Sequence, residues 1–149
     1  MNKILSYSIK EASQLCGLPE STLRYYETIG IIKPIDRNPS SGHRVFSEDD
    51  INLIIGVACL NATGMSIEDM KVYLENVSGG NRYARDQIKL LETQKKCLAE
   101  EERSLKLRRR YVDIKIEYWN AATENNKKGM EEAKQKAQKM TKEINPTKE

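Results

Sequence analysis

The residues of this 149-residue chain best suited to forming polar contacts lie in the segment STLRYYE, residues 21–27. There an arginine, Arg24, stands beside two tyrosines, Tyr25 and Tyr26. Guanidinium and phenol groups donate hydrogen bonds, and the arginine side chain matches the oxygens of phosphate and carboxylate. Packing one helix face requires only a few apolar residues per turn, so the remaining side chains indicate a contact surface.

The chain has few residues for catalysis or metal binding. It has one histidine, no nucleophile and base at a motif spacing, and no glycine-rich loop for phosphate. Its three cysteines, Cys16, Cys59 and Cys97, are widely separated, which argues against a disulfide framework or a zinc site within one chain. We therefore expect no enzymatic activity, no metal and no cofactor.

Composition favours a helical protein with small cores. Charged residues make up 32% of the chain, and there is one Phe and one Trp. Residues 1–80 carry 7 basic and 10 acidic side chains, and residues 81–149 carry 18 and 12, so any DNA contact must depend on local placement of charge. With no signal sequence and no apolar run of about 18 residues, we expect a reduced, cytoplasmic protein without a membrane contact.

Capping signals divide the first 80 residues into short helices. Ser8 and Glu11 form a capping box, Gly17 ends the helix that follows, and a second helix is predicted over residues 19–29. Residues 33–46 have a Pro, Asn, Ser and Gly centre that predicts a small hairpin. Two further helices follow, capped by Ser47 with Asp50 and by Ser66 with Asp69, and a domain boundary is predicted at residue 80.

Beyond residue 80 the sequence predicts a long, charged helix. Its apolar row repeats every seven residues, as in a coiled coil, which predicts a dimerisation helix over residues 81–120. The row consists of Leu91, Leu98, Leu105, Val112 and Trp119. Residues 121–149 are predicted to be a charged, marginally ordered tail, in which Met130, Ala133, Ala137, Met140 and Ile144 mark one face of a weak helix.

The order of helix, turn, helix and arginine-bearing hairpin is that of a winged helix-turn-helix. It places STLRYYE on the recognition helix, with its polar side toward the major groove and backbone of DNA. The residues expected at DNA are Ser21, Thr22, Arg24, Tyr25, Tyr26, Arg37, His43 and Arg44. Alternatives are that Tyr26 belongs to the core and that Arg24 pairs with Glu20 or Glu27.

The blocks YSIKEASQLCGLPESTLRYYETIGIIKP, SGHRVFSEDDINLI and TGMSIEDMK resemble the helix-turn-helix, the wing and the fourth helix of the mercury-resistance regulator (MerR) family. The heptads resemble its dimerisation helix. The resemblance covers about residues 5–119 and implies a homodimer joined by an antiparallel coiled coil. Such a regulator binds a palindromic promoter spacer and activates transcription by distorting the DNA, which involves RNA polymerase only indirectly.

The effector is less clearly indicated than the DNA. Cys59 resembles the single cysteine of the branch of the family that senses aldehyde and thiol stress, whereas the other reading makes it a buried residue of an apolar helix. A non-covalent small-molecule effector is a further alternative. The run Arg108–Arg110 reads as a solvated helix face rather than a second nucleic-acid site. From another functional class, a coiled-coil adaptor or architectural DNA-binding protein is also open.

Overall fold

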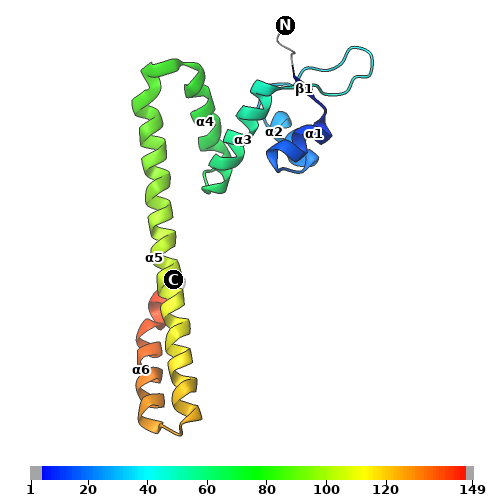
Figure 1. Ribbon diagram of the computed structural model, residues 1–149. Coiled ribbons are helices and arrows are strands. Elements are labelled where there is room, and N and C mark those ends of the chain that lie inside the picture. The colour runs from blue at the N-terminus through cyan, green and yellow to red at the C-terminus, as the bar shows by residue number, and fades with distance from the viewer. Residues whose placement is uncertain (1–4, 147–149) are drawn as a thin grey trace. The chain divides into compact units, whose positions relative to one another are not determined.

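The computed structural model describes residues 5–146, and the chain divides into two compact units on either side of the bond between Gln94 and Lys95. The prediction of a mainly helical fold with a small antiparallel sheet is confirmed (Figure 1). Along the chain the elements are β1 (Ser6–Tyr7), α1 (Ile9–Cys16), α2 (Glu20–Thr28), β2 (Phe46–Ser47), α3 (Glu48–Ala62), α4 (Ile67–Ser78), the 3-10 helix η1 (Gly80–Tyr83), α5 (Ala84–Thr123) and α6 (Lys127–Ile144).

Helices α1 and α2 form the predicted helix-turn-helix. The hydroxyl of Ser8 accepts a hydrogen bond from the Glu11 backbone N–H at 3.2 Å and starts α1. Gly17 ends α1 with a φ of 66°, in the left-handed region that glycine enters at little cost. Pro19 is the N-cap residue of α2, with φ −58° and ψ 147°, and it makes no side-chain capping bond.

The first unit is built around one apolar core to which α1, α2, α3 and α4 all contribute. Fully buried Leu23 and Phe46 lie in it together with Ile54 and Met70. Apolar burial of this kind is the main stabilising term of a small domain, at about 25 cal/mol per Å². The complete set is Ala12, Leu23, Tyr26, Ile31, Ile32, Ile35, Phe46, Ile51, Ile54, Val57, Met65 and Met70.

The wing is the loop between α2 and β2, and its two arms are joined by a single antiparallel bridge from Arg37 to Arg44. The Asn38 N–H donates to the His43 carbonyl at 2.8 Å and tightens the tip. The two-stranded sheet itself pairs β2 with β1, a strand that the sequence analysis did not predict because two residues show no alternation. The sheet therefore attaches the returning arm of the wing to the N-terminal segment.

Helix α4 ends at Ser78, and the first turns of α5 bond back to α4, so the first compact unit extends past residue 80 to Gln94. Gln87 of α5 donates from its side-chain amide to the Tyr73 carbonyl at 2.8 Å and accepts from Asn76 at 3.0 Å. Gln94 reaches the Thr63 carbonyl at the end of α3. The start of α5 is thus part of the first unit.

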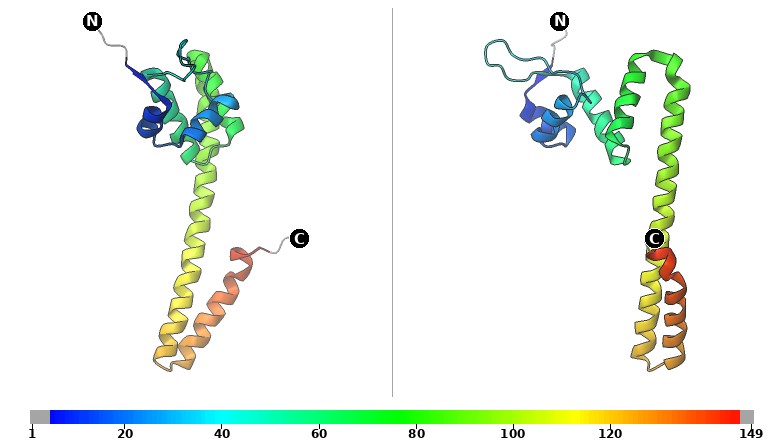
Figure 2. Two further views of the ribbon diagram at one scale, coloured as in Figure 1. Left: turned by 90° about the vertical axis from the view of Figure 1, so that its right-hand side faces the viewer. Right: turned by 180° about the vertical axis from the view of Figure 1, so that it is seen from behind.

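The second unit is a helical hairpin made by the remainder of α5 and by α6, which turns back along it (Figure 2). The sequence predicts a marginally ordered tail with one face of a weak helix; residues 127–144 form a continuous helix, and Ala133, Ala137 and Met140 of the predicted face are the ones that pack. Two small residues, Ala133 and Ala137, allow α6 to approach α5 closely and bury Ile114. The Asn126 side chain caps α6 by accepting from the Gly129 N–H at 3.0 Å.

Candidate DNA-binding surface

Helix α2 has one buried and one polar face. Leu23 and Tyr26, three residues apart, point into the core, and Tyr26 is only 5% exposed. Tyr25 is 50% exposed and its ring lies 6.4 Å from that of Tyr26. The alternative that Tyr26 is a core residue is therefore the arrangement found, whereas Tyr25 presents its phenol to solvent.

The polar face of α2 carries Ser21, Arg24 and Tyr25 as exposed residues and Thr22 as a half-buried one. The Arg24 guanidinium lies 3.5 Å from the Glu20 carboxylate, and both side chains are largely exposed. An exposed pair one helical turn apart contributes little to stability, about 0.3–0.5 kcal/mol, so Arg24 can leave Glu20 for a stronger anion at small cost.

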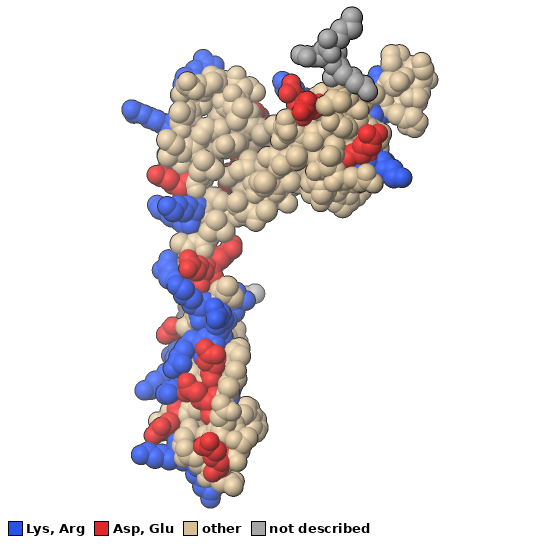
Figure 3. All heavy atoms as spheres, in the orientation of Figure 1, with Lys and Arg blue, Asp and Glu red and all other residues tan. Residues whose placement is uncertain are grey.

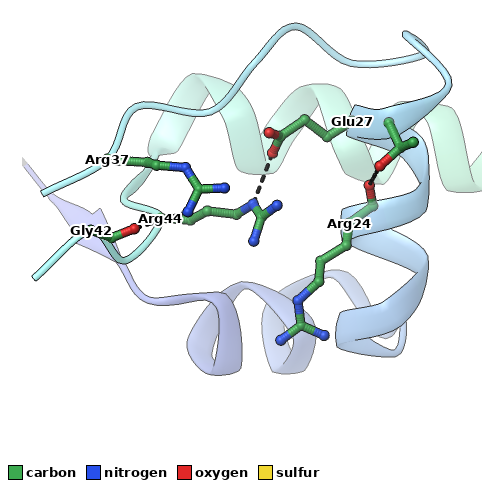
Figure 4. A network of polar contacts seen from close by, with 6 residues as sticks. Arg24, Glu27, Arg37, Gly42 and Arg44 are labelled. Carbon is green, nitrogen blue, oxygen red and sulfur yellow. Dashed lines mark hydrogen bonds and ion pairs between the residues drawn. The ribbon is translucent and has the colours of Figure 1, made fainter.

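The wing brings two more arginines to the same region (Figure 4). Arg37 donates from Nη1 to the Gly42 carbonyl at 2.9 Å, a bond that crosses the wing. Gly42 has a φ of 72° and so turns the tip in a conformation that other residues rarely adopt. His43, next to it, is exposed.

Arg44 is held differently from the other arginines. Its Nε donates to Oε2 of Glu27 at 2.9 Å, and the two side chains are 20% and 16% exposed. This pair spans 17 residues and joins α2 to the wing. The sequence alternatives for Glu27 included a pair with Arg24, but Arg24 takes Glu20 and Glu27 takes Arg44.

The structure leaves Arg24 and Tyr25 exposed on α2 and places Arg44 of the wing against Glu27 of the same helix, whereas Tyr26 is buried in the core. Glu27 is the residue that the sequence analysis missed as a partner of the wing. No local spacing could have indicated it, because the pairing depends on how the wing folds back over α2.

Cys59 is exposed on α3, which contradicts its reading as a buried residue. It lines a groove of about 370 Å³ between α3 and α4 together with apolar residues that include Leu60 and Val77. Cys16 is half-buried against the core, and burial raises the pKa of its thiol. Cys97 is exposed on α5. Cys59 therefore combines access to solvent with an apolar surface.

The heptad row of α5, namely Leu91, Leu98, Leu105, Val112 and Trp119, is exposed along its whole length. Helix α6 packs on other residues, centred on buried Ile114 with Tyr111 and Tyr118 beside it. At 100° per residue, Leu105 and Ile114 lie about 180° apart around α5. The helix therefore covers one apolar face within its own chain and leaves the opposite face uncovered.

Charges of both signs are interspersed over the second unit (Figure 3). Within it Arg110 lies 3.4 Å and Lys136 lies 3.1 Å from the carboxylate of Glu117. Among residues 5–146, no group of three His, Cys, Asp or Glu side chains could hold a metal ion. In that same part of the chain, no helix has the length and apolar character needed to cross a membrane.

Together, the tight turn between α1 and α2, the arginine-bearing wing and the exposed polar face of α2 define a winged helix-turn-helix protein. Residues 7–77 match the family model described as MerR HTH family regulatory protein. An uncharacterized HTH-type transcriptional regulator of Haemophilus influenzae is 30% identical over 114 residues, which cover 76% of this chain and 81% of that protein. The chain belongs to the MerR family of regulatory proteins.

Three further comparisons extend this relationship. The regulator AdhR of Bacillus subtilis is 35% identical over 98 residues, or 66% of this chain. The chain spans 64% of the length of AdhR and 52% of the length of YyaN, an uncharacterized regulator of the same organism. The crystal structure of HiNmlR, a MerR family regulator lacking the sensor domain and bound to promoter DNA, has a TM-score of 0.64 and 26% identity, covering 85% of this chain and 96% of that one.

Proposed function

We propose that this protein is a cytoplasmic transcriptional regulator that binds double-stranded promoter DNA as a homodimer. The observation that carries the proposal is the exposure of Arg24 and Tyr25 on α2 beside a wing that carries Arg37 and Arg44 and is joined to α2 through Glu27. Arginine and tyrosine donors suit phosphate oxygens, and phosphate contacts fix the position of a protein on a duplex. Ser21 and Thr22, at the start of α2, are the candidates for reaching base edges in the major groove.

Dimerisation through the heptad row is the second part of the proposal. Leu98, Leu105 and Val112 are exposed large apolar side chains at a heptad spacing, and α6 covers the opposite face of α5. Exposed apolar rows of this length mark interaction surfaces in soluble proteins. A second copy in an antiparallel coiled coil buries the row and presents two recognition helices, which suits a palindromic site.

The proposed mode of action is a change of DNA shape. A regulator that bends and untwists the spacer between two promoter elements aligns them for RNA polymerase without a large contact with the enzyme itself. The cost of such deformation is a few kcal/mol, and it contributes to sequence preference at positions that no side chain touches. An effector then shifts the balance between two DNA-bound shapes.

For the effector, we propose electrophiles such as aldehydes, acting on Cys59. Its exposure allows an electrophile to reach the thiol, and its place in the groove between α3 and α4 means that an adduct alters packing next to Leu60. An adduct that fits the groove better in one of two shapes shifts their balance, and a difference of about 1–3 kcal/mol changes the ratio of the two by about five- to 150-fold. The alternative is a non-covalent ligand, which the volume and apolar lining of the same groove would suit.

DNA selection tests the first part of the proposal. The protein is used to enrich duplexes from a random-sequence library, and we expect a palindromic consensus in the recovered pool. Recovery of DNA without any consensus contradicts promoter recognition and favours the architectural or adaptor alternative. The matched control is a variant with Arg24→Ala and Tyr25→Ala, which should recover little DNA.

Reporter transcription tests the effector. A promoter carrying the selected site is assayed with and without formaldehyde or methylglyoxal, for the wild type and for Cys59→Ser, Cys16→Ser and Cys97→Ser. We expect only Cys59→Ser to lose the response. If Cys59→Ser responds like the wild type, electrophile sensing at this residue is wrong, and the non-covalent alternative gains support.

A further inference from the structure

Glu27 places a carboxylate beside the surface that is proposed to bind phosphate, where it should repel DNA. It lies on α2 between buried Tyr26 and exposed Thr28, and it is bound to Arg44 at 2.9 Å. Exposed acids at such a surface usually lower affinity through simple electrostatics. The mostly buried, charge-assisted bond to Arg44 indicates that this acid has another role.

The bond has a specific geometry at the arginine. Glu27 accepts from Nε, and no hydrogen bond of Nη1 or Nη2 of Arg44 is found within residues 5–146. A guanidinium has five N–H donors in a rigid plane, so fixing Nε sets the direction of the two terminal nitrogens. With Nε occupied by Glu27, the two terminal nitrogens remain as parallel donors that can bind a phosphate in a two-point contact.

Core packing of buried Ile35 and backbone bonds from Ile31 and Ile32 to the Tyr26 carbonyl anchor the base of the outgoing arm, so the bond from Arg44 to Glu27 acts mainly on the returning arm. The two arms of the wing are linked by the bridge from Arg37 to Arg44 and by short backbone bonds near the tip, all of which lie within the wing. Phe46, two residues after Arg44, is buried in the core and anchors the returning arm. The pair from Glu27 to Arg44 is the side-chain hydrogen bond that links the wing directly to α2 in the described chain.

We propose that Glu27 is a positioning residue of the DNA-binding surface, which acts through Arg44 by holding the wing against α2 and by orienting its terminal nitrogens. The inference rests on the proposed function. Removing a negative charge beside DNA should by electrostatics alone strengthen binding, whereas removing the Glu27 carboxylate should weaken it.

Affinity for a mixed-sequence duplex tests this, since phosphate contacts do not require the operator. We expect Glu27→Ala to bind about three- to tenfold more weakly than the wild type. Glu27→Gln keeps an acceptor for Nε and should stay near the wild type, whereas Glu27→Asp keeps the charge but shortens the reach and should bind weakly. Glu20→Ala, which removes an exposed acid from the same helix, should bind at least as tightly as the wild type.

The decisive measurement is the double variant. If Glu27 acts through Arg44, then Glu27→Ala causes no further loss in an Arg44→Ala background, and the removed repulsion raises affinity slightly. Thermal unfolding of each variant shows whether it is folded. If Glu27→Ala does not fold, the affinities of Glu27→Gln and Glu27→Asp test the proposal, because the first should bind like the wild type and the second more weakly.

Two outcomes overturn the proposal: tighter binding by Glu27→Ala than by the wild type, or a Glu27→Asp variant that equals the wild type while Glu27→Gln exceeds it. Either outcome means that Glu27 contributes only its charge. A wild-type protein that binds no DNA contradicts the proposed function instead, so the two failures are distinguishable.

Discussion

The side-chain amide of Gln94 donates a hydrogen bond to the backbone carbonyl of Thr63, where α3 ends. Gly64 follows with a φ of 81° and turns the chain toward α4, beneath the amide. The bond ties the first part of α5 to the turn between α3 and α4. Together with the bonds of Gln87 to α4, this contact offers a route by which a change at the start of α5 can reach the helices of the first unit.

We expect Gln94→Ala to loosen this turn, because a part-buried carbonyl loses its partner at a cost of about 1 kcal/mol. Hydrogen-deuterium exchange of residues 62–66 should speed up while the α1–α2 segment stays protected. Gln138→Ala, an exposed glutamine on α6, is the control and should leave that exchange unchanged. Equal exchange in Gln94→Ala and the wild type would show that the contact transmits nothing.

The contributions of Arg24 and Tyr25 to DNA binding should differ in how they depend on salt concentration. Removing the charge of Arg24 with Arg24→Ala weakens DNA binding and lowers the slope of log affinity against log salt by about one, because one fewer counterion is released. Tyr25→Phe removes an uncharged hydroxyl donor, so the affinity for DNA should fall while the slope of log affinity against log salt stays the same. Fluorescence titrations at several salt concentrations measure both quantities. An Arg24→Ala variant with the wild-type slope excludes its phosphate contact.

If the proposed dimer forms through the heptad row, Leu105→Asp should convert it to monomers. A carboxylate in an apolar seam must give up its hydration without a partner, which costs several kcal/mol across two copies. Ser104→Asp adds the same charge one residue away, outside the row, and should leave the dimer intact. Sedimentation velocity at micromolar concentration compares the two. A Leu105→Asp dimer, or a monomeric wild type, places the interface elsewhere.

The cysteines should differ in reactivity. Cys59 and Cys97 are exposed, whereas Cys16 is half-buried and burial raises the pKa of its thiol. Because only the thiolate attacks, we expect Cys16 to be alkylated at least about tenfold more slowly than the other two at neutral pH. Mass spectrometry of timed maleimide labelling measures each site. Fast labelling of Cys16 would mean that the core around α1 opens readily.

The hairpin of α5 and α6 should weaken in acid. The hydrogen bond from Lys136 holds the pKa of Glu117 below its ordinary value of 4.5, so the folded state favours the carboxylate. That contribution is present above pH 4.5 and is lost as the pH falls through the lower, folded pKa. Glu117→Gln should therefore melt below the wild type at neutral pH and approach it in acid. The control is Glu124→Gln, which changes an exposed glutamate in the turn after α5. It should melt like the wild type at every pH.

Much of the first unit was predictable because its signals are local. Caps at Ser8, Ser47 and Ser66 begin three helices, and Gly17 ends one, each through contacts within a few residues. The tail was misjudged for a related reason. A helix of alanine, lysine and glutamine carries little apolar surface by itself, so its order depends on Ile114 and its neighbours in α5, which the tail sequence does not reveal.

The site divides in the same way. Exposure of Arg24 and Tyr25 follows from helical spacing against Leu23 and Tyr26, which the sequence contains. The pairing of Arg44 with Glu27 does not follow from helical spacing, since a contact between residues 17 positions apart depends on the path of the wing. Cys59 is a third case: its helix is apolar nearly all round, so the sequence could not distinguish which positions are covered.

The opposite placement of the heptad row and the α6-facing row makes α5 sensitive to the length of its own sequence. An inserted residue between Leu105 and Tyr111 rotates all that follows by about 100° about the helix axis. The hairpin would then still close on itself, but Val112 and Trp119 would no longer share a stripe with Leu105. Insertions and deletions in this helix should therefore come in steps of seven residues, which nearly preserve the angle at which each side chain leaves the helix axis. In the first unit, by contrast, length changes should be tolerated in the wing loop between α2 and β2.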